Sequence, residues 1–365
     1  MVRKLVLGVK GKLTANNVTI VNGEASIVDK NHVLCGDETY ECDNLLLCTG
    51  SETFIPLIPG IDTVPYWTHR DALDNKELPK SLVVIGGGVI GMEFASFFNS
   101  LGVEVTVIEM LDEILGGMDK ELSAMLRVEY AKRGIKFMLN TKVVSLDGSA
   151  GENGETQVRV NYENAEGTGF SVAEKLLMSV GRRPVTKGFG LENLNPEKTE
   201  RGNIRVDGQM RTSVTGVYVC GDLTGFSLLA HTAVREAEVA VHAVLGKKDC
   251  MSYRAIPGVV YTNPEIAGVG DTEEALQKKG IPYRTVKLPM AYSGRFVAEN
   301  EGVNGMCKLL LAEDDTVLGA HVLGNPASEI ITLAGMAVEL KLTAAEWKKI
   351  VFPHPTVGEI FKEVL

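Results

Sequence analysis

The sequence has little that would place the protein in a membrane, in an oxidising compartment or on a nucleic acid. Its 365 residues include six cysteines without any Cys-x-x-Cys pair, a pattern of reduced thiols that argues against a disulfide framework and against a zinc site. No block of like charges stands out, and 37 basic against 47 acidic residues give a net charge of −10. Nucleic acids and anionic membranes are recognised by basic patches, so neither partner is favoured.

Long apolar runs are also missing. The longest, residues 82–98, is interrupted by four glycines and by Glu93, which makes it a poor membrane span. Residues 1–12 lack the apolar core of a secretory signal, and we expect a cytoplasmic protein. The hydrophobic content of 45% excludes disorder, and the length predicts two or three domains with substantial cores.

The middle of the chain alternates strands and helices. Residues 82–85 form a β-branched run followed by glycines, which is typical of a buried strand. The next helix is expected to begin at Val89 and to end at Gly102, a natural C-cap. A strand over 103–108, a helix over 120–133 and a strand over 136–139 follow. Strands connected through helices pair in parallel, so the sequence predicts an α/β fold with a parallel sheet.

Shorter segments surround this sheet. Further strands are expected over 18–21, 25–28, 45–48, 158–162, 175–180 and 217–220. The other expected segments are a connector over 56–65, an acidic, glycine-rich loop over 148–155 and a helix over 230–245. The last part of the chain combines strands over 307–311 and 317–323 with a helix near 329–340, which is typical of an α+β module.

Glycines follow the strand over 82–85 at a spacing that suits a dinucleotide. Gly86, Gly88 and Gly91 fit Gly-x-Gly-x-x-Gly at the start of a helix. In this pattern the first glycine makes a tight turn, the second admits a pyrophosphate and the third lets helix and strand pack closely. The helix N-terminus then offers N–H groups and its positive end to the phosphates. The candidate loop is completed by Gly87, Val89 and Ile90.

Glu109 at the end of the following strand makes a dinucleotide site more plausible than a plain turn. It stands 18 residues after Gly91, where a carboxylate can accept hydrogen bonds from a ribose 2′-hydroxyl. A carboxylate there repels the extra phosphate of NADP, and residues 110–113 include no arginine to receive one. NAD is therefore the predicted cofactor. The alternative for Glu109 is a solvated residue at a strand end.

Two further segments carry candidate chemistry. Asp222 follows Gly221 at the carboxyl end of the strand over 217–220, where parallel sheets bind ligands, and it could accept hydrogen bonds from sugar or ribityl hydroxyls. His354 lies between two prolines, with Glu359 five residues later. This carboxylate could fix the imidazole tautomer and leave the other ring nitrogen as a general base. The alternatives are an ordinary turn after a strand and a surface turn at a His-Pro pair.

Together these motifs resemble those of the class I pyridine-nucleotide-disulfide oxidoreductases and, within that family, the dihydrolipoamide dehydrogenases. The resemblance runs along nearly the whole chain and also covers residues 49–51, 181–184, 228–231 and 262–265. It implies a Rossmann-type NAD domain over 76–189 inserted in an incomplete FAD domain over 1–75 and 190–250. A C-terminal α+β dimerisation domain over 251–365 follows, and such proteins form homodimers.

The resemblance also implies site residues and partners. The NAD site would be lined by Gly86, Gly88, Gly91, Glu109 and Gly181, with Val144 near the adenine. FAD would be contacted by Thr49, Gly50, Ser51, Asp222, Leu228, Leu229, Ala230 and His231, with Gly11 near its adenine. His354, supported by Glu359, would be the base for the thiols of the partner subunit. The family reaction passes electrons from dihydrolipoamide, carried on lipoyl domains of a 2-oxoacid dehydrogenase or glycine-cleavage complex, through a cysteine pair and FAD to NAD.

The sequence departs from the family at its start. Family members begin with a Gly-x-Gly-x-x-Gly turn for the ADP half of FAD and continue with a Cys-x-x-x-x-Cys redox pair, and neither precedes Gly86 here. We expect about 100 residues, roughly one domain, to be missing relative to the family. Without the pair no thiolate attacks a disulfide. Cys42 and Cys48 are the closest two cysteines, and Cys48 falls in a predicted buried run, so we interpret both as structural.

Two hypotheses remain open. The first is an enzyme of the dihydrolipoamide dehydrogenase type, or another NAD(P)H-dependent disulfide or NADH oxidoreductase of the same family, which is inactive alone because the redox-active cysteines are missing. The second is a module that binds NAD, dimerises and catalyses nothing. Glu109 and a C-terminus without paired cysteines argue against the NADP-linked and mercury-reducing branches of the family.

Overall fold

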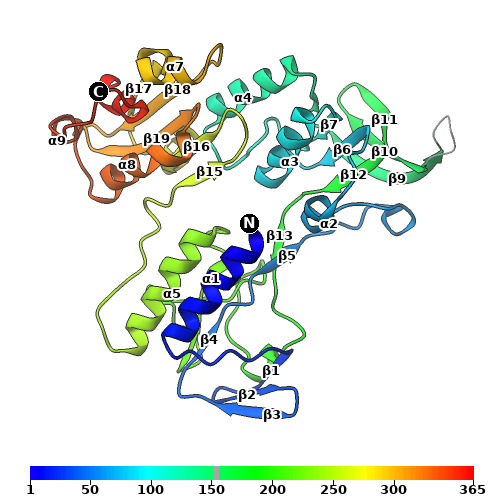
Figure 1. Ribbon diagram of the computed structural model, residues 1–365, viewed down its shortest axis with the longest axis vertical. Helices are drawn as coiled ribbons and strands as arrows, with labels where there is room; N and C mark the ends of the chain where they lie inside the picture. The colour runs from blue at the N-terminus through cyan, green and yellow to red at the C-terminus, as the bar shows by residue number, and fades with distance from the viewer. Residues whose placement is uncertain (151–155) are drawn as a thin grey trace. The chain divides into compact units, whose positions relative to one another are not determined.

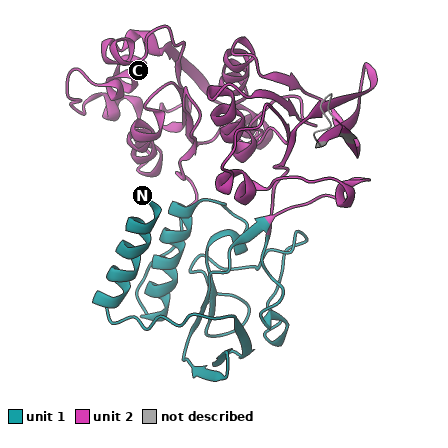
Figure 2. Cartoon of the chain, turned by 45° about the vertical axis from the view of Figure 1, so that its right-hand side comes forward, with its two compact units in different colours: residues 1–52, 184–252 teal, residues 53–183, 253–365 magenta. Residues whose placement is uncertain are grey.

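The computed structural model describes residues 1–150 and 156–365, and the chain divides into two compact units (Figure 2). Unit 1 combines residues 1–52 with 184–252, and unit 2 combines residues 53–183 with 253–365. Each unit is therefore assembled from two separate stretches of the chain. The predicted NAD and dimerisation domains fall mostly in unit 2 and the predicted FAD segments mostly in unit 1. The three-domain division itself stays a prediction.

Unit 2 contains the parallel sheet that the sequence predicts. Its strands run in the order β12–β6–β7–β8, with bounds Lys175–Met178, Ser81–Ile85, Glu104–Ile108 and Lys136–Met138. Helices α3 (Val89–Ser100) and α4 (Lys120–Lys132) provide the crossovers (Figure 1). Leu82, Val84 and Val107 are fully enclosed because a parallel sheet is covered on both faces. The elements predicted between residues 82 and 139 are confirmed to within two residues at each end.

A second sheet of unit 2 pairs long antiparallel strands. They are β9 (Lys142–Ala150), β10 (Thr156–Asn164) and β11 (Gly167–Ala173), and β10 contains the strand predicted over 158–162. The loop predicted over 148–155 is wrong at its start, because Gly148 continues β9 opposite Val158. The ladder with β10 outweighs the turn tendency of that glycine. Residues 151–155 lie outside the described residues.

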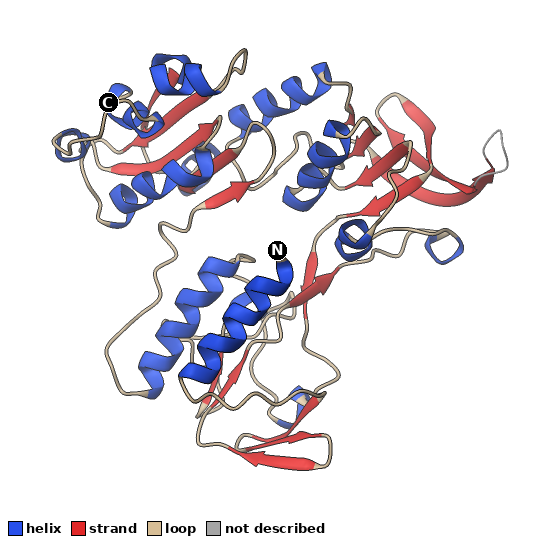
Figure 3. Cartoon of the chain, viewed as in Figure 1, coloured by secondary structure: helices blue, strands red, loops and turns tan. Residues whose placement is uncertain are grey.

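The C-terminal part of unit 2 is an antiparallel sheet with helices, as the sequence predicts (Figure 3). The strand order is β15–β16–β19–β18–β17, with bounds Gly258–Val260, Ile266–Gly270, Val317–Leu323, Met306–Leu311 and Arg284–Pro289. Helix α8 (Ala327–Glu339) packs Ile331, Ala334 and Val338 into the core of this sheet. The other helices are α6 (Glu273–Lys279), α7 (Gly294–Glu299), α9 (Ala344–Lys348) and α10 (Ile360–Glu363).

A buried ion cluster ties α4 to β18 inside unit 2. The ammonium group of Lys308, whose side chain is 2% exposed, lies 2.9 Å from Asp119 Oδ2 and 3.0 Å from Glu121 Oε2. It also contacts the carboxylate of Glu273. Burial acts to lower the pKa of Lys308, but hydrogen bonds to the three carboxylates outweigh it and raise that pKa. The cluster stabilises the packing between the parallel sheet and the C-terminal part of unit 2.

Unit 1 is built on a short parallel pair of strands. β4 (Leu45–Leu47) and β14 (Val217–Val219) run side by side, with Leu47 opposite Val219. Both strands were expected, each one residue longer. Helix α5 (Ala230–Val244) confirms the predicted helix and buries Val239 and Ala240. An antiparallel sheet of β1 (Ala25–Asp29), β2 (His32–Cys35) and β3 (Glu38–Glu41) belongs to the same unit, and β1 confirms the strand predicted over 25–28.

The start of unit 1 differs from the prediction. Residues 18–21 are coil, because Val18, Ile20 and Val21 are 47%, 39% and 44% exposed and find no partner strand among the described residues. A β-branched run without such a partner does not make a strand. Helix α1 (Val2–Ala15) was not predicted, and none of its residues, all of which are described, is buried.

Short elements complete the described chain. They are β5 (Ser51–Thr53), β13 (Arg182–Pro184), α2 (His69–Asp74), η1 (Ile61–Thr63), η2 (Leu191–Asn193), η3 (Gly221–Leu223), η4 (Met290–Tyr292) and η5 (Val357–Glu359). The connector predicted over 56–65 is irregular apart from η1. Within residues 1–150 and 156–365, no helix has the length and apolar character that crossing a membrane requires.

Candidate functional site

The predicted glycine triplet lies between β6 and α3 in unit 2, and the fold itself demands glycine at both of its ends. Gly86 adopts a φ of +103°, and a Cβ there would lie 2.5 Å from the carbonyl oxygen of Ser179. A Cβ on Gly91 would lie 2.0 Å from the carbonyl oxygen of Gly86. The Ser179 hydroxyl donates to that same carbonyl at 2.9 Å. The turn therefore closes against the end of β12 and leaves no room for a side chain.

Gly88, in the middle of the triplet, behaves differently. A Cβ there would meet no described heavy atom within 4 Å, so packing does not require glycine at this position. Gly88 is the N-cap of α3, and no described side chain caps the helix. The first-turn N–H groups, including those of Val89 and Ile90, have no acceptor within the helix. An open glycine beside such N–H groups is what the close approach of a phosphate requires.

Glu109 closes the glycine loop from the end of β7. Its Oε2 accepts a hydrogen bond from the Gly87 N–H at 2.6 Å, and its Oε1 accepts one from the Leu111 N–H at 2.8 Å. The structure thus brings the predicted ribose-binding carboxylate to the predicted phosphate loop. The carboxylate also orders the loop, a role that the sequence did not suggest.

The other two NAD candidates lie on different elements of unit 2. Gly181 follows β12 with a φ of +125°, and its carbonyl oxygen accepts a hydrogen bond from the Phe54 N–H at 2.9 Å. Val144 lies within β9. Their contacts with a nucleotide stay predictions.

The predicted flavin residues of unit 1 gather at the ends of β4 and β14. Thr49 and Gly50 follow β4, where the Thr49 hydroxyl donates to the Val185 carbonyl oxygen at 2.8 Å and Gly50 has a φ of +70°. The Ser51 hydroxyl donates to the carboxylate of Asp222, a residue 171 positions away. Two of the predicted residues therefore lie side by side at the carboxyl ends of parallel strands.

A buried carboxylate that the sequence analysis missed supports this strand end. Gly221 has a φ of +73°, and its N–H donates to Glu236 at 2.5 Å. Glu236 is 0% exposed and lies on α5 among Thr232, Val239 and Ala240. The sequence signal that could have identified Glu236 is an acidic residue on the apolar face of the predicted helix.

The remaining flavin candidates lie in or directly before helices of unit 1. Leu228, Leu229, Ala230 and His231 lead into α5, whose N-cap is Leu229 and which no described side chain caps. Gly11 lies in the exposed helix α1, and a Cβ there would meet no described atom within 4 Å. The surroundings of Gly11 therefore do not require glycine.

His354 and Glu359 in unit 2 form the predicted pair. His354 Nδ1 lies 2.9 Å from Glu359 Oε1, and Glu359 Oε2 accepts the Thr356 N–H at 2.7 Å. The Thr356 N–H and then the imidazole lower the pKa of Glu359, so the carboxylate is ionised at neutral pH. When Nδ1 donates to it, Nε2 is left as a proton acceptor. The His354 side chain is 83% exposed, so this acceptor is open to an outside group.

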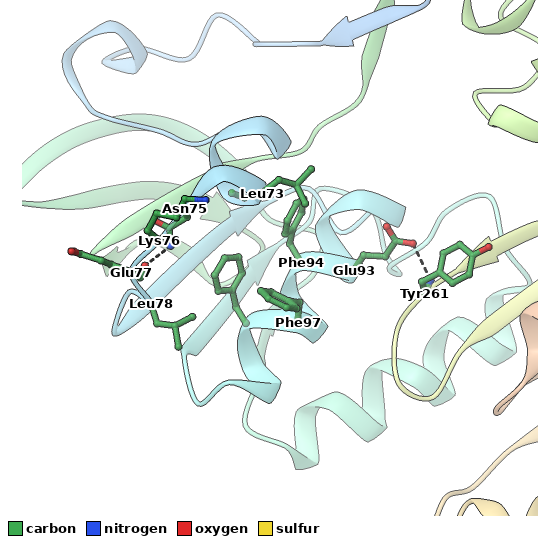
Figure 4. A pocket seen from close by; sticks show the side chains of 11 residues that line it. Leu73, Asn75, Lys76, Glu77, Leu78, Glu93, Phe94, Phe97 and Tyr261 are labelled. Atoms are coloured by element: carbon green, nitrogen blue, oxygen red, sulfur yellow. Dashed lines mark hydrogen bonds between the residues drawn. The ribbon is translucent and has the colours of Figure 1, made fainter. Parts of the chain in front are cut away.

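A pocket of about 390 Å³ lies beside α3 in unit 2 (Figure 4). Its apolar wall includes Leu73, Phe94 and Phe97. Glu93 lines the same pocket and accepts the Tyr261 N–H at 2.9 Å, drawn as the dashed line between these two residues in Figure 4. Burial raises the pKa of Glu93. In the sequence Glu93 stands out only as an interruption of an apolar run.

The prediction that Cys48 lies in a buried run is wrong. β4 ends at Leu47, so Cys48 lies beyond the buried strand and is exposed. Its Sγ lies 3.3 Å from the Sγ of Cys220. Cys42 is half-buried. In the described part of the chain, no group of three or more His, Cys, Asp or Glu residues is placed to hold a metal ion.

Known families account for nearly all of the chain. The pattern of the family described as "Pyridine nucleotide-disulphide oxidoreductase" matches residues 1–237, and that of the corresponding dimerisation domain matches residues 256–365. Dihydrolipoyl dehydrogenase from Geobacillus stearothermophilus is 38% identical over 369 residues, which cover 100% of this chain and 77% of that protein. The mitochondrial dihydrolipoyl dehydrogenase of Homo sapiens is 36% identical over 375 residues, 99% of this chain and 72% of that protein.

Solved structures agree with this picture. The HOCl-induced flavoprotein disulfide reductase RclA from Escherichia coli matches with a TM-score of 0.87 at 26% identity, over 99% of this chain and 83% of that one. LpdA from Mycobacterium tuberculosis matches with a TM-score of 0.86 at 27% identity, over 98% of this chain and 79% of that one. The predicted α/β fold with a C-terminal dimerisation domain is confirmed.

Proposed function

Because the chain belongs to the pyridine nucleotide-disulphide oxidoreductases, a family that binds FAD and NAD(P), we propose that it is an NAD-linked oxidoreductase of the dihydrolipoamide dehydrogenase type. The observation that carries this proposal is the glycine loop closed by Glu109. The relatives from Geobacillus stearothermophilus and Homo sapiens, both named dihydrolipoyl dehydrogenase, support the substrate class.

The residues of the glycine loop fit NAD. The N–H groups at the start of α3 and the open position at Gly88 accommodate the pyrophosphate. The carboxylate of Glu109 favours a free ribose 2′-hydroxyl and repels a 2′-phosphate, because like charges close together raise the free energy of the complex. Gly181 and Val144 extend the proposed site.

The residues at the ends of β4 and β14 fit part of FAD. Asp222, held by the Ser51 hydroxyl, presents a carboxylate to ribityl hydroxyls, and the N-terminus of α5 favours a negatively charged group. FAD, when bound, supplies two-electron transfer between thiols and the nicotinamide. The residues in this chain hold and orient it, with Thr49, Gly50 and residues 228–231 as further contacts.

His354 is the proposed base. Glu359 holds Nδ1, so that Nε2 can take a proton from a thiol of the dihydrolipoamide or of the partner subunit. The dimerisation domain supports a homodimer, in which this exposed histidine serves a neighbouring chain. Lipoyl domains of a 2-oxoacid dehydrogenase or glycine-cleavage complex are the proposed donors.

The missing cysteine pair limits what the chain does alone. No two of its cysteines have the Cys-x-x-x-x-Cys spacing, so we expect NADH to be bound and, with FAD present, to be oxidised by an artificial acceptor, whereas dihydrolipoamide is not oxidised. The six scattered cysteines, without any Cys-x-x-Cys pair, support a reducing compartment such as the cytoplasm.

The experiment measures binding and turnover on the purified chain with added FAD. We expect calorimetry to show NADH binding about tenfold tighter than NADPH, which corresponds to about 1.4 kcal/mol. NADH-dependent reduction of ferricyanide is expected, and NAD reduction by dihydrolipoamide is not. Equal affinity for NADPH would overturn the NAD preference. Rapid turnover of dihydrolipoamide would overturn the expected inactivity.

A second candidate function is a module that binds NAD and dimerises without catalysis. The missing cysteine pair together with the matched dimerisation domain favours it. It predicts NADH binding and a dimer in light scattering, with no ferricyanide reduction even when FAD is saturating. Ferricyanide reduction therefore separates the two functions, and a monomer that binds no NADH contradicts both.

A further inference from the structure

Two cysteines of unit 1 stand directly opposite each other at the ends of paired strands. The parallel register of β4 and β14 places Leu47 opposite Val219, and the ladder continues one step as the Cys220 N–H donates to the Leu47 carbonyl oxygen at 3.2 Å. Cys48 and Cys220 are the next residues on the two strands. Their Sγ atoms lie 3.3 Å apart although 172 positions separate the residues.

This arrangement suits a covalent bond between the two sulfur atoms. Neighbouring strands lie about 4.7–4.9 Å apart, which is within the range of about 4.4–6.8 Å that joins the Cα atoms of disulfide-bonded cysteines. The sulfur atoms need to approach from 3.3 Å to about 2.05 Å. Side-chain rotation supplies a movement of that size without displacing either strand.

The two thiols are unequal in a way that gives each a separate role. Cys48 is exposed and Cys220 is buried. A hydrogen bond from Cys220 lowers the pKa of Cys48, whereas the hydrogen bond to Cys48, together with burial, raises the pKa of Cys220. The accessible sulfur is therefore the one that ionises first, and thiolates are the form that reacts with oxidants. The buried sulfur keeps its proton until its partner has reacted.

We propose that Cys48 and Cys220 form a reversible intrachain disulfide when the protein meets a hydroperoxide. The Cys48 thiolate attacks the terminal oxygen of the hydroperoxide and breaks the O–O bond, which gives a sulfenic acid and releases water or an alcohol after protonation. The sulfur of Cys220 then attacks the sulfenic sulfur, loses its proton and expels the sulfenic oxygen as water. Two thiols are oxidised and one peroxide is reduced. A dithiol reverses the reaction by exchange.

This modification is independent of the oxidoreductase activity proposed above. It needs the two thiols and an oxidant, and neither FAD nor NAD takes part. The other cysteines provide controls, because Cys307 is fully enclosed in the core of unit 2 and Cys250 is exposed.

The test treats the reduced full-length chain with a small excess of hydrogen peroxide, blocks the remaining thiols and maps the peptides without reduction. Cleavage after acidic residues and after Lys and Arg separates Cys48, in peptide 44–52, from Cys42 and isolates Cys220 in peptide 212–222. We expect these two peptides to be linked, with a mass two hydrogen atoms below their sum, and to separate on treatment with dithiothreitol. The product is expected to run as a single chain on a non-reducing gel.

Matched variants distinguish this pair from general thiol oxidation. Cys48→Ser and Cys220→Ser should each abolish the linked peptide, and Cys250→Ser should leave its yield unchanged. In Cys220→Ser the sulfenic acid on Cys48 has no second thiol beside it and should be trapped by dimedone. Cys220→Ala replaces Cys220→Ser if circular dichroism shows that the serine variant is unfolded. Peptide 44–52 linked to any other cysteine, or left unlinked while thiols are consumed elsewhere, overturns the proposal.

Discussion

Two strands of this protein end in a glycine with positive φ followed by candidate nucleotide-binding residues, but the two ends are built differently. In unit 2, β6 leads through Gly86 almost directly into the twelve-residue helix α3. In unit 1, β14 leads through Gly221 into the short helix η3, and the long helix α5 begins only at Ala230.

The difference lies in where the supporting groups come from. One continuous strand–helix–strand stretch supplies the glycine loop, the helix N-terminus and Glu109. At the other end Gly221 is held by Glu236, 15 positions away, but Asp222 is held by Ser51, 171 positions away in the chain. The glycine loop after β6 therefore depends on the space around its backbone atoms. The candidate flavin site after β14 depends instead on a pair of side chains, Ser51 and Asp222, from distant parts of the chain.

Gly91→Ala tests this comparison with the largest expected effect. The added Cβ lies 2.0 Å from the Gly86 carbonyl oxygen, so we expect unfolding free energy to fall by about 3 kcal/mol and NADH affinity to be lost. Denaturant unfolding and calorimetry measure the two effects.

Two matched glycines serve as controls for that experiment. Gly88→Ala meets no described atom within 4 Å of its Cβ, so we expect a stability loss below about 1 kcal/mol together with weakened NADH binding. Gly117→Ala, equally open within the described chain, should change neither quantity. Wild-type stability in Gly91→Ala would contradict the packing argument.

Substitution of Glu109 should have the next largest effect. Glu109→Ala removes the acceptor of the Gly87 and Leu111 N–H groups, and we expect a stability loss of about 1–3 kcal/mol and a fall of about tenfold in NADH affinity, equivalent to about 1.4 kcal/mol. The preference for NADH over NADPH should disappear. Glu109→Gln keeps one oxygen acceptor and should lose less stability. A variant that binds NADH as wild type does would remove Glu109 from the site.

Substitutions at the end of β14 should affect flavin alone. In Asp222→Ala we expect FAD to bind about tenfold more weakly. In Ser51→Ala one hydrogen bond to Asp222 is lost, and we expect the free energy of FAD binding to weaken by about 1 kcal/mol. Flavin fluorescence during dilution measures retention, and NADH calorimetry on the same samples is the control. Weakened NADH binding in either variant would show that the two sites are not independent.

The smallest expected effect is a difference between the units in their response to acid. Burial lowers the pKa of His321 in unit 2, below the unfolded value of about 6.5. Below about pH 6.5 the imidazole of His321 is protonated in the unfolded chain but stays neutral in the native state, so the free energy of unfolding falls as the pH drops below about 6.5. In His321→Gln the melting temperature should change less between about pH 7.5 and about pH 5.5, two values on either side of about 6.5, than it does in the wild type.

In unit 1 the corresponding group is Asp249. Arg235, and then His242, hold the pKa of Asp249 far below its ordinary value, so the stabilising effect of this carboxylate persists at neutral pH and declines only as the pH falls below about 4. Asp249→Asn should therefore leave the pH dependence of the melting temperature between neutral pH and about pH 5.5 unchanged. An identical slope in wild type and His321→Gln would contradict the assignment to His321.

What the sequence could predict follows the same division. The parallel sheet, the glycine loop and the position of Glu109 were predictable because strand, turn and helix signals lie next to one another in residues 82–109. The Ser51–Asp222 bond could not be derived, since its partners are 171 positions apart and only pairing of β4 with β14 brings them together. The exposure of Cys48 was mispredicted because the apolar run continues one residue beyond the end of the strand.

Errors at the N-terminus have a different physical cause. Residues 18–21 have the composition of a strand but no described partner strand. Helix α1 has no buried face, so its sequence need not show the helical spacing of apolar residues by which a helix is predicted. Glu236 and Glu93 were missed because an acid on an apolar helix suggests exposure, whereas each accepts a backbone N–H where the helix is covered.

The parallel pairing of β4 with β14 also fixes an order of events during synthesis. A ribosome releases Leu45–Leu47 early, yet these residues cannot pair until Val217–Val219 have emerged. At typical elongation rates of about 5–20 residues per second, the 172 positions between Cys48 and Cys220 correspond to roughly ten to thirty seconds. By then β6, β7, β8 and β12 are all available. The strand Leu45–Leu47 is therefore made long before its native partner, whereas β1 can pair with β2 at once.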